Sequence, residues 1–349
     1  MSNVLLQVED LRKYFHAGGS ASFLGGAHGR REVKAVDGVS FDIMAGERFA
    51  LVGESGSGKS TIARCVLKLL NPTSGRVVFD GKTIFDSGAD ISLSHNGMMP
   101  LRRDMQVIFQ NPDASLDPRM TAAEVVAEGI LKHKIAPRRE ASKAAMDYLE
   151  LCGLARSEAG KRTPEFSGGQ KQRIGIARAL ALKPRLVVAD EPLSALDVSV
   201  QAQILALMQD LSEQLSLTFL FISHDLRTVR FFCDRTGVLY LGTLVETGAA
   251  EEVMADPLHP YTRSLVSSIP RDRPGERRPR LKLEGEIPSA ANSPLGCKFH
   301  PRCPHRAAIC ESVVPILEDA GGISKRSVAC HLWRTLARVV TEGNAGVGI

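Results

Sequence analysis

The chain has 349 residues, of which 44 are lysine or arginine and 39 are acidic, so that its formal net charge is +5; hydrophobic residues make up 44%. This length allows a large core domain and a second, smaller domain. No stretch approaches the roughly 20 apolar residues of a membrane span, and no charged and apolar leader opens the chain. We therefore expect a soluble, cytoplasmic protein, whose modest positive charge does not by itself indicate binding to nucleic acid.

A glycine-rich segment, GESGSGKS at 53–60, fits the G-x-x-x-x-G-K-[ST] pattern of a phosphate-binding loop. In such a loop the glycines let backbone N–H groups face the phosphates, the lysine reaches the terminal phosphates and the serine hydroxyl holds Mg²⁺. The apolar run 48–52 predicts a buried strand entering the loop, and 61–70 predicts a helix leaving it. The residues expected to bind the nucleotide here are Gly53, Glu54, Ser55, Gly56, Ser57, Gly58, Lys59, Ser60 and Thr61.

A second apolar run, Leu186–Ala189, ends in two carboxylates, Asp190 and Glu191. It predicts a central parallel strand whose C-terminal end faces the ligand, as in open α/β sheets. A phosphate loop needs such a strand because the metal must be held from a second side. We expect Asp190 to orient Mg²⁺ through water and Glu191 to polarise the attacking water.

A second candidate anion site is FSGGQ at 166–170. Ser167 is expected to cap a helix that begins near Gly169, which places its hydroxyl and neighbouring N–H groups at a helix N-terminus.

Together these segments resemble the ATP-binding cassette (ABC) family, the nucleotide-binding subunits of ABC transporters. Ser167, Gly168, Gly169 and Gln170 match the family signature, with Phe166 where leucine is commoner. Gln110 matches the Q-loop glutamine, Asp197 the D-loop aspartate and His224 the switch histidine that contacts the terminal phosphate. The motifs follow in family order over roughly residues 4 to 250.

The resemblance implies an α/β fold, a P-loop NTPase cassette with a RecA-like core, an antiparallel β subdomain and a helical subdomain. It implies an ATPase coupled to transport that uses ATP and Mg²⁺. The catalytic residues would be Lys59, Gln110, Glu191 and His224, and the metal would be held by Ser60, Gln110 and Asp190. Tyr14 would stack on adenine, although the neighbouring Phe15 is an alternative.

In the family, two cassettes pair head to tail and each ATP lies between one chain's phosphate loop and the other chain's signature. Lys59 and Ser167 of this chain would then serve different ATP sites. We expect the isolated chain to bind ATP and to turn it over slowly.

The sequence predicts two parts, a cassette at 1–255 and an extension at 256–349. Within the cassette, strands are expected at 76–80, 104–109, 218–222 and 236–241. The pattern between 111 and 173 is helical, with a Thr-x-x-Glu capping box opening 121–133 and an amphipathic run at 139–152. This matches the family's helical subdomain, which docks a coupling helix of the membrane subunit.

The extension carries HPYT at 259–262 and a proline- and arginine-rich run at 271–280, which predicts an exposed linker. It resembles the C-terminal extension of ATPases that power oligopeptide, dipeptide and nickel uptake. The glycine-rich insertion after Tyr14 and the run 111–118 resemble the F-type subunit, whose partner is a non-identical, D-type ATPase.

The function implied is an ATPase peripheral to the cytoplasmic face of the inner membrane. It would dock on two transmembrane permease subunits and work with an extracytoplasmic substrate-binding protein to import di- or oligopeptides. Alternatives are nickel or glutathione as cargo, or a soluble ABC ATPase acting on DNA or ribosomes. Soluble ABC ATPases that act on DNA or ribosomes usually carry two cassettes in one chain or a long coiled-coil insertion. This sequence shows neither feature, so no nucleic-acid partner is expected.

Four of the seven cysteines, Cys297, Cys303, Cys310 and Cys330, fall within one segment of the extension, 297–330. Clustering in a cytosolic chain favours metal over disulfide. Their spacing, C-x5-C-x6-C-x19-C, matches neither zinc ribbons nor common ferredoxin runs. Because importer ATPases of the resembled type can carry a [4Fe–4S] cluster in this tail, we expect that cluster, with zinc or reduced structural thiols as alternatives.

Overall fold

The computed structural model describes residues 3–17, 31–269, 285–286, 288–321 and 325–336. The basic linker 271–280 and the glycine-rich insertion beyond Ala17 lie outside these described residues.

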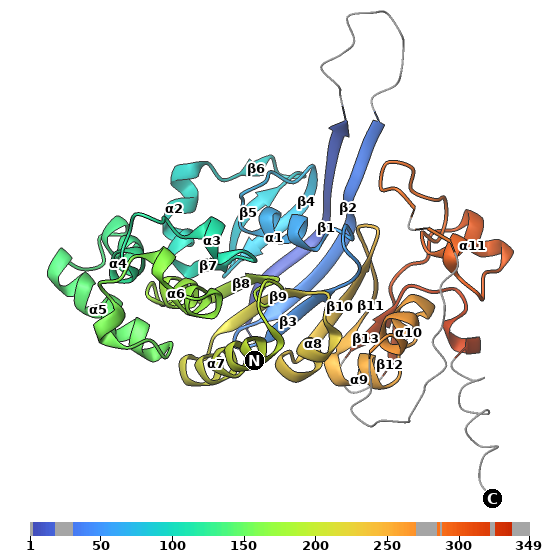
Figure 1. Cartoon of the computed structure of the whole chain (residues 1–349). Coiled ribbons are helices and arrows are strands. Elements are labelled where there is room, and N and C mark those ends of the chain that lie inside the picture. Colours follow the sequence, from blue (N-terminus) through green and yellow to red (C-terminus); the bar gives the residue numbers. More distant parts are fainter. Residues whose placement is uncertain (1–2, 18–30, 270–284, 287, 322–324, 337–349) are drawn as a thin grey trace, which may run out of the picture.

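The chain folds around two β-sheets, with helices packed on them (Figure 1). The strands are β1 (Val4–Ala17), β2 (Arg31–Met44), β3 (Arg48–Val52), β4 (Ser74–Phe79), β5 (Lys82–Asp86), β6 (Ile91–Ser92), β7 (Met105–Ile108), β8 (Leu186–Asp190), β9 (Thr218–Ser223), β10 (Arg235–Tyr240), β11 (Thr243–Ala249), β12 (Glu318–Gly321) and β13 (Arg326–Val328). The helices are α1 (Lys59–Val66), α2 (His95–Asp104), α3 (Pro112–Ser115), α4 (Ala122–Lys132), α5 (Arg138–Leu151), α6 (Gly168–Leu180), α7 (Val198–Leu215), α8 (Leu226–Phe232), α9 (Ala250–Ala255), α10 (Pro260–Ser267) and α11 (Ala308–Ser312), with short 3₁₀ turns η1 (Arg156–Glu158), η2 (Thr163–Glu165) and η3 (His300–Arg302).

The core sheet has the order β12-β13-β11-β10-β3-β9-β8-β7. Strands β10, β3, β9, β8 and β7 pair in parallel, so their carboxyl ends meet at one edge. Their apolar runs are buried on both faces, as helices cover the two sides of a parallel sheet. The predicted strand positions are therefore confirmed, with ends shifted by one or two residues.

The second sheet, β2-β1-β4-β5-β6, is antiparallel and corresponds to the expected β subdomain. Helices α4, α5 and α6 form a separate lobe on the side of the core sheet where β7 and β8 lie (Figure 1). Thr121 accepts a hydrogen bond from the Glu124 backbone at 3.3 Å, and the Glu124 carboxylate accepts from the Thr121 N–H at 2.9 Å, so the predicted capping box is present.

The extension continues the core sheet, which its sequence did not predict. Strand β13 pairs antiparallel with β11, and β12 pairs with β13. The buried carboxylate of Glu246 in β11 accepts a hydrogen bond from Arg326 Nη2 of β13 at 2.7 Å and from the backbone N–H groups of Leu258 and His259 at 2.9 Å. Because an unpaired buried charge is costly, this network holds the extension on the sheet edge.

His259 caps the first helix of the extension, α10. Its Nδ1 accepts a hydrogen bond from the Tyr261 N–H at 3.0 Å, and the side chain is buried beside the Phe299 ring. Burial, with a smaller contribution from Arg263, lowers the pKa of His259 to about 3. The ring is therefore neutral in the folded protein over the physiological range.

This buried histidine predicts a loss of stability in mild acid. The unfolded chain binds a proton at His259 below about pH 6.5 and the folded chain does not until about pH 3, so the free energy of unfolding falls by about 1.4 kcal/mol per pH unit between them. His259→Asn replaces the capping ring nitrogen with a capping amide oxygen and does not titrate. Urea unfolding at pH 7.5 and pH 5.0 should show the wild type losing about 2 kcal/mol more than the variant; equal losses would contradict the prediction.

Candidate functional site

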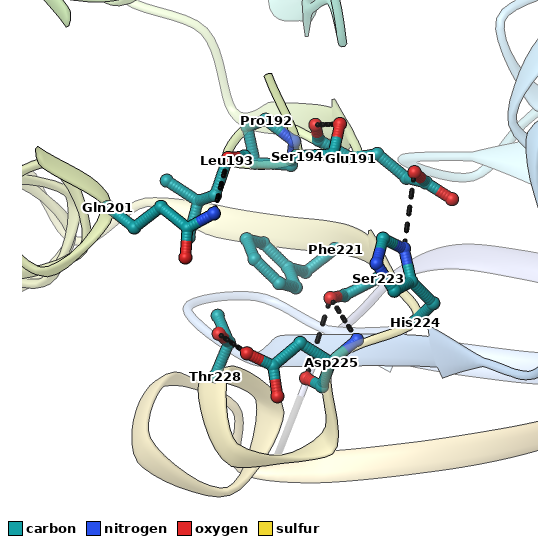
Figure 2. A pocket seen from close by; sticks show the side chains of 10 residues that line it. All are labelled: Glu191, Pro192, Leu193, Ser194, Gln201, Phe221, Ser223, His224, Asp225 and Thr228. Carbon is teal, nitrogen blue, oxygen red and sulfur yellow. Dashed lines mark hydrogen bonds and ion pairs between the residues drawn. The ribbon is translucent and has the colours of Figure 1, made fainter. Parts of the chain in front are cut away.

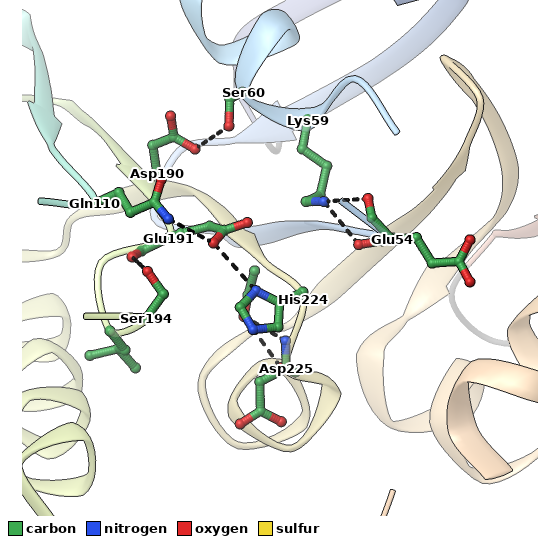
Figure 3. Close-up of polar contacts among 12 residues, drawn as sticks. Glu54, Lys59, Ser60, Gln110, Asp190, Glu191, Ser194, His224 and Asp225 are labelled. Atoms are coloured by element: carbon green, nitrogen blue, oxygen red, sulfur yellow. Dashed lines mark hydrogen bonds and ion pairs between the residues drawn. The ribbon is translucent and has the colours of Figure 1, made fainter. Parts of the chain in front are cut away.

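The loop between β3 and α1 closes around the ammonium group of Lys59. Its Nζ donates to the carbonyl oxygens of Gly53 and Glu54 at 2.9 and 3.0 Å and lies 3.4 Å from Ser57 Oγ. Burial lowers the pKa of Lys59, and the nearby carboxylates of Glu191 and Asp190 oppose that shift. The positive charge therefore sits between the loop and the two acidic residues that end β8 (Figure 3).

Two glycines permit the backbone course of this loop. A Cβ atom on Gly53 would lie 2.3 Å from the carbonyl oxygen of Leu239, and one on Gly58 would lie 2.3 Å from that of Ala35. Gly58 also has a φ of +106°. No other residue type fits at these positions without moving a neighbouring strand.

Ser60 and Asp190 form the candidate Mg²⁺ position. The Ser60 hydroxyl, at the start of α1, donates to Asp190 Oδ1 at 2.7 Å. Burial raises the pKa of Asp190, and the bond from Ser60 and the charge of Arg64 lower it. A hydroxyl and a carboxylate are oxygen ligands of the kind that Mg²⁺ takes, with phosphates and water completing its shell. The pair fits the predicted metal.

Glu191 contacts two other residues that are expected to be catalytic, Gln110 and His224. Its Oε2 accepts from Gln110 Nε2 at 3.3 Å and lies 3.3 Å from His224 Nδ1 (Figure 3). Glu191 adopts a φ of +46°, and its N–H donates to the Ile222 carbonyl oxygen of β9 at 3.0 Å. This left-handed conformation costs on the order of 1–3 kcal/mol in a non-glycine residue and is characteristic of functional sites.

A pocket lies beside Glu191 and His224, lined by residues from the ends of β8 and β9 and from helices α7 and α8 (Figure 2). It is lined by Glu191, Pro192, Leu193, Ser194, Gln201, Phe221, Ser223, His224, Asp225 and Thr228. Gln201 donates to the carbonyl oxygens of Leu193 and Leu196 at 3.0 Å, which fixes the segment before Asp197. The sequence reasoning did not single out Gln201, because a glutamine inside a helix carries no local signal.

The signature segment caps α6. Ser167 Oγ accepts from the Gln170 N–H at 3.3 Å, and Gln170 Oε1 accepts from the Ser167 N–H at 3.0 Å, a reciprocal capping box. The predicted cap is confirmed, with the helix beginning at Gly168. A Cβ atom on Gly169 would lie 2.5 Å from Val200 Cγ1, so the signature packs directly against the start of α7 beside Asp197. Ser167 and Asp197 are both exposed.

Tyr14 and Phe15 differ in their surroundings. The Tyr14 hydroxyl donates to Asp37 Oδ1 at 2.5 Å, and burial and this bond raise the pKa of Tyr14. The other oxygen of Asp37 accepts from Lys298 Nζ of the extension at 2.9 Å. Phe15 is 39% exposed. The Tyr14 ring is thus held in place, whereas stacking on adenine stays a prediction for either ring.

The four cysteines of the extension lie in one region. The Cys297 N–H donates to the Cys310 carbonyl oxygen at 2.9 Å, and the pKa of Cys330 is raised to about 11, by burial first and then by Cys297, Cys303 and Cys310. The predicted metal-binding arrangement is not found: across the described residues, no group of three or more His, Cys, Asp or Glu side chains is positioned to hold a metal ion. Burial raises the pKa of Cys297, Cys303 and Cys330, which favours the protonated thiols over the thiolates that bind metal. The [4Fe–4S] cluster and zinc are therefore unsupported here.

Comparison with known proteins agrees with this geometry. Residues 36–194 match the ABC transporter family, and residues 245–310 match the family described as oligopeptide/dipeptide transporter, C-terminal region. The chain is 45% identical over 334 residues to the oligopeptide transport ATP-binding protein AppF of Bacillus subtilis, covering 94% of this chain and 97% of AppF. It is 51% identical over 288 residues to a peptide import ATP-binding protein of Brucella ovis, covering 82% of this chain and 89% of that protein.

The chain belongs to the ABC transporter family of ATP-binding proteins. A solved structure of the ATP-binding cassette MJ0796, a dimer in a post-hydrolysis state with ADP and Pi, superposes with a TM-score of 0.60 at 28% identity, covering 70% of this chain and 99% of that one. The expected α/β cassette fold and the ATPase activity are thereby confirmed. In the part of the chain that is described, no helix is both long and apolar enough to span a membrane.

The contacts of Glu191 predict its role in hydrolysis. Glu191→Gln keeps the shape and the φ requirement of the residue and removes the carboxylate that is expected to polarise water, so hydrolysis by the assembled ATPase should fall by about 10²-fold or more. ATP binding, which depends on the Lys59 loop, should persist. Single-turnover hydrolysis and equilibrium ATP binding measured on the same preparation test this. Undiminished turnover, or loss of binding together with hydrolysis, would contradict the assignment.

Proposed function

We propose that this ABC ATPase energises the import of di- and oligopeptides through a membrane permease. The observation that carries the proposal is the C-terminal extension. Residues 245–310 match the oligopeptide/dipeptide transporter C-terminal region, and relatives that cover 94% and 82% of the chain are named for peptide transport or import. ATP-binding subunits do not contact cargo, so the cassette itself carries no information about peptide length.

The roles proposed for the site follow from its contacts. Residues 53–61 and Lys59 bind the phosphates, and Ser60, Asp190 and Gln110 hold Mg²⁺. Glu191 polarises the attacking water and His224 contacts the terminal phosphate. ATP is hydrolysed mainly by positioning and charge neutralisation. These roles are supported by the contacts of Gln110 and His224, which both lie 3.3 Å from the same carboxylate oxygen of Glu191.

We further propose that the active unit is a head-to-tail dimer with a second, D-type ATPase. Ser167 and Asp197 are exposed and belong to adjoining surface segments, which supports a role for them in a partner's ATP site. The dimeric state of the MJ0796 cassette supports the same geometry. The cassette would comprise 1–255 and the extension 256–349. The helical subdomain 111–173 would dock a coupling helix of the membrane subunit, in a complex with two permease subunits at the cytoplasmic face of the inner membrane.

Reconstitution tests the transport function. The complete complex of both ATPases, permease subunits and substrate-binding protein should hydrolyse ATP faster when a di- or oligopeptide is added, and should accumulate that peptide in vesicles. Omitting this chain is the control and should abolish uptake. Stimulation by nickel or glutathione but by no peptide would contradict the cargo, and stimulation by nucleic acid alone would contradict transport.

The [4Fe–4S] cluster stays a prediction, with zinc as the alternative. Its support is that Cys297, Cys303, Cys310 and Cys330 lie in one region of the extension. Iron, acid-labile sulfide and zinc should be measured on protein purified without oxygen, with Cys303→Ser as the variant and Cys65→Ser, in a buried cassette position, as the control. About four irons per chain that are lost only in Cys303→Ser would support the cluster. A metal-free wild type would contradict it.

A further inference from the structure

Arg302 of the extension forms a bidentate ion pair with Glu54 of the phosphate loop. Its Nη1 donates to Glu54 Oε2 at 2.9 Å and its Nη2 donates to Glu54 Oε1 at 3.2 Å. The Arg302 side chain is 8% exposed and that of Glu54 is 26% exposed. Fork-like pairs of arginine with carboxylate are directional and strong when they are shielded from water. The pair joins residues 248 positions apart in the sequence.

The backbone of Glu54 is held by a second residue of the extension. The Glu54 N–H donates to the Tyr261 hydroxyl at 2.9 Å, and Tyr261 is fully buried. The Tyr240 ring lies 4.7 Å from the Tyr261 ring, and its hydroxyl accepts from Arg302 Nη1 at 3.4 Å. The anchor is therefore rigid, and Glu54 is fixed at both its side chain and its backbone.

The position of Glu54 gives these contacts a consequence for ATP. Its carbonyl oxygen is one of the two that accept from Lys59 Nζ, so a shift of Glu54 would move the lysine that faces the terminal phosphates. Its carboxylate also places a negative charge in a loop built for an anion, and an unpaired charge there would repel the triphosphate. Arg302 holds that carboxylate by two hydrogen bonds and neutralises its charge.

We propose that Arg302, assisted by Tyr261, is a positioning residue for ATP: it neutralises Glu54 and fixes the first turn of the phosphate loop, so that the extension sets the affinity of the cassette for nucleotide. The inference rests on the proposed nucleotide site. Neither residue contacts the reacting atoms, and both act through Glu54.

Equilibrium binding of Mg·ATP to the full-length chain tests the proposal. Arg302→Ala should raise Kd by on the order of tenfold, because the Glu54 charge is then unpaired beside the phosphates. Arg302→Lys should fall between the wild type and Arg302→Ala, since it keeps the charge and loses the fork. Arg306→Ala, an exposed arginine of the same extension, is the charge-matched control and should bind like the wild type.

The double variant Arg302→Ala with Glu54→Gln separates positioning by charge from simple loss of structure. Removing the repelling carboxylate should return Kd to within about threefold of the wild type, which a general loosening of the fold would not do. In the assembled ATPase, Arg302→Ala should raise the KM for ATP by more than it lowers kcat. An unchanged Kd in Arg302→Ala, or no recovery in the double variant, would overturn the proposal.

Two further variants keep the outcome decisive. If Arg302→Ala fails to fold, Tyr261→Phe retains the packed ring and removes only the acceptor of the Glu54 N–H, and should raise Kd severalfold; no change would overturn the proposal. Lys59→Ala should abolish ATP binding. If it binds normally, the proposed nucleotide site is wrong, whereas loss in Lys59→Ala beside normal binding in Arg302→Ala and Tyr261→Phe would refute this inference alone.

Discussion

The close approach of the phosphate loop to the backbone of its neighbours is the constraint on which the site depends. At Gly53 and Gly58 a single added carbon would collide with the carbonyl oxygens of Leu239 and Ala35. The loop is thereby clamped between β10 and β2, one strand from each sheet. This clamp sets where α1 starts and hence where Lys59 and Ser60 point, because both lie in its first turn.

The parallel order of the core sheet then brings the other half of the site to the same edge. Strand β9 lies between β3 and β8, so the carboxyl ends that carry the loop, His224 and the pair Asp190 and Glu191 are neighbours. Ser60, which follows β3, donates a hydrogen bond directly to Asp190 at the end of β8. The candidate site is therefore spread over three strand ends: a register shift of β8 would separate Asp190 from Ser60, and a shift of β9 against β8 would separate His224 from Glu191.

Local patterns in the sequence predicted the features that neighbouring residues determine, namely buried strands and helix caps. Apolar runs that end in functional residues located β3 and β8, and short-range capping rules located Thr121 and Ser167. The family resemblance supplied the grouping of Gln110, Glu191 and His224, and in the structure Gln110 and His224 both contact Glu191 Oε2. The addition of β12 and β13 to the core sheet was not predictable, because short polar strands carry almost no periodicity. The side-chain link between β13 and β11 is a buried ion pair between Glu246 and Arg326, residues far apart in the sequence.

The extension illustrates the same limit at the site itself. Arg302 lies next to Cys303, in a segment where the clustered cysteines suggested a metal site. No pattern in the neighbouring sequence links Arg302 to the phosphate loop, 248 residues away. Four residues before it, Lys298 pairs with Asp37, which in turn holds the Tyr14 hydroxyl. One short turn of the extension thus reaches both the phosphate loop and the tyrosine expected near adenine. Both links are ion pairs partly shielded from solvent. A displacement of this turn would therefore alter the two sides of the proposed nucleotide site together, so that the cassette and its extension would act as one unit in the binding of ATP.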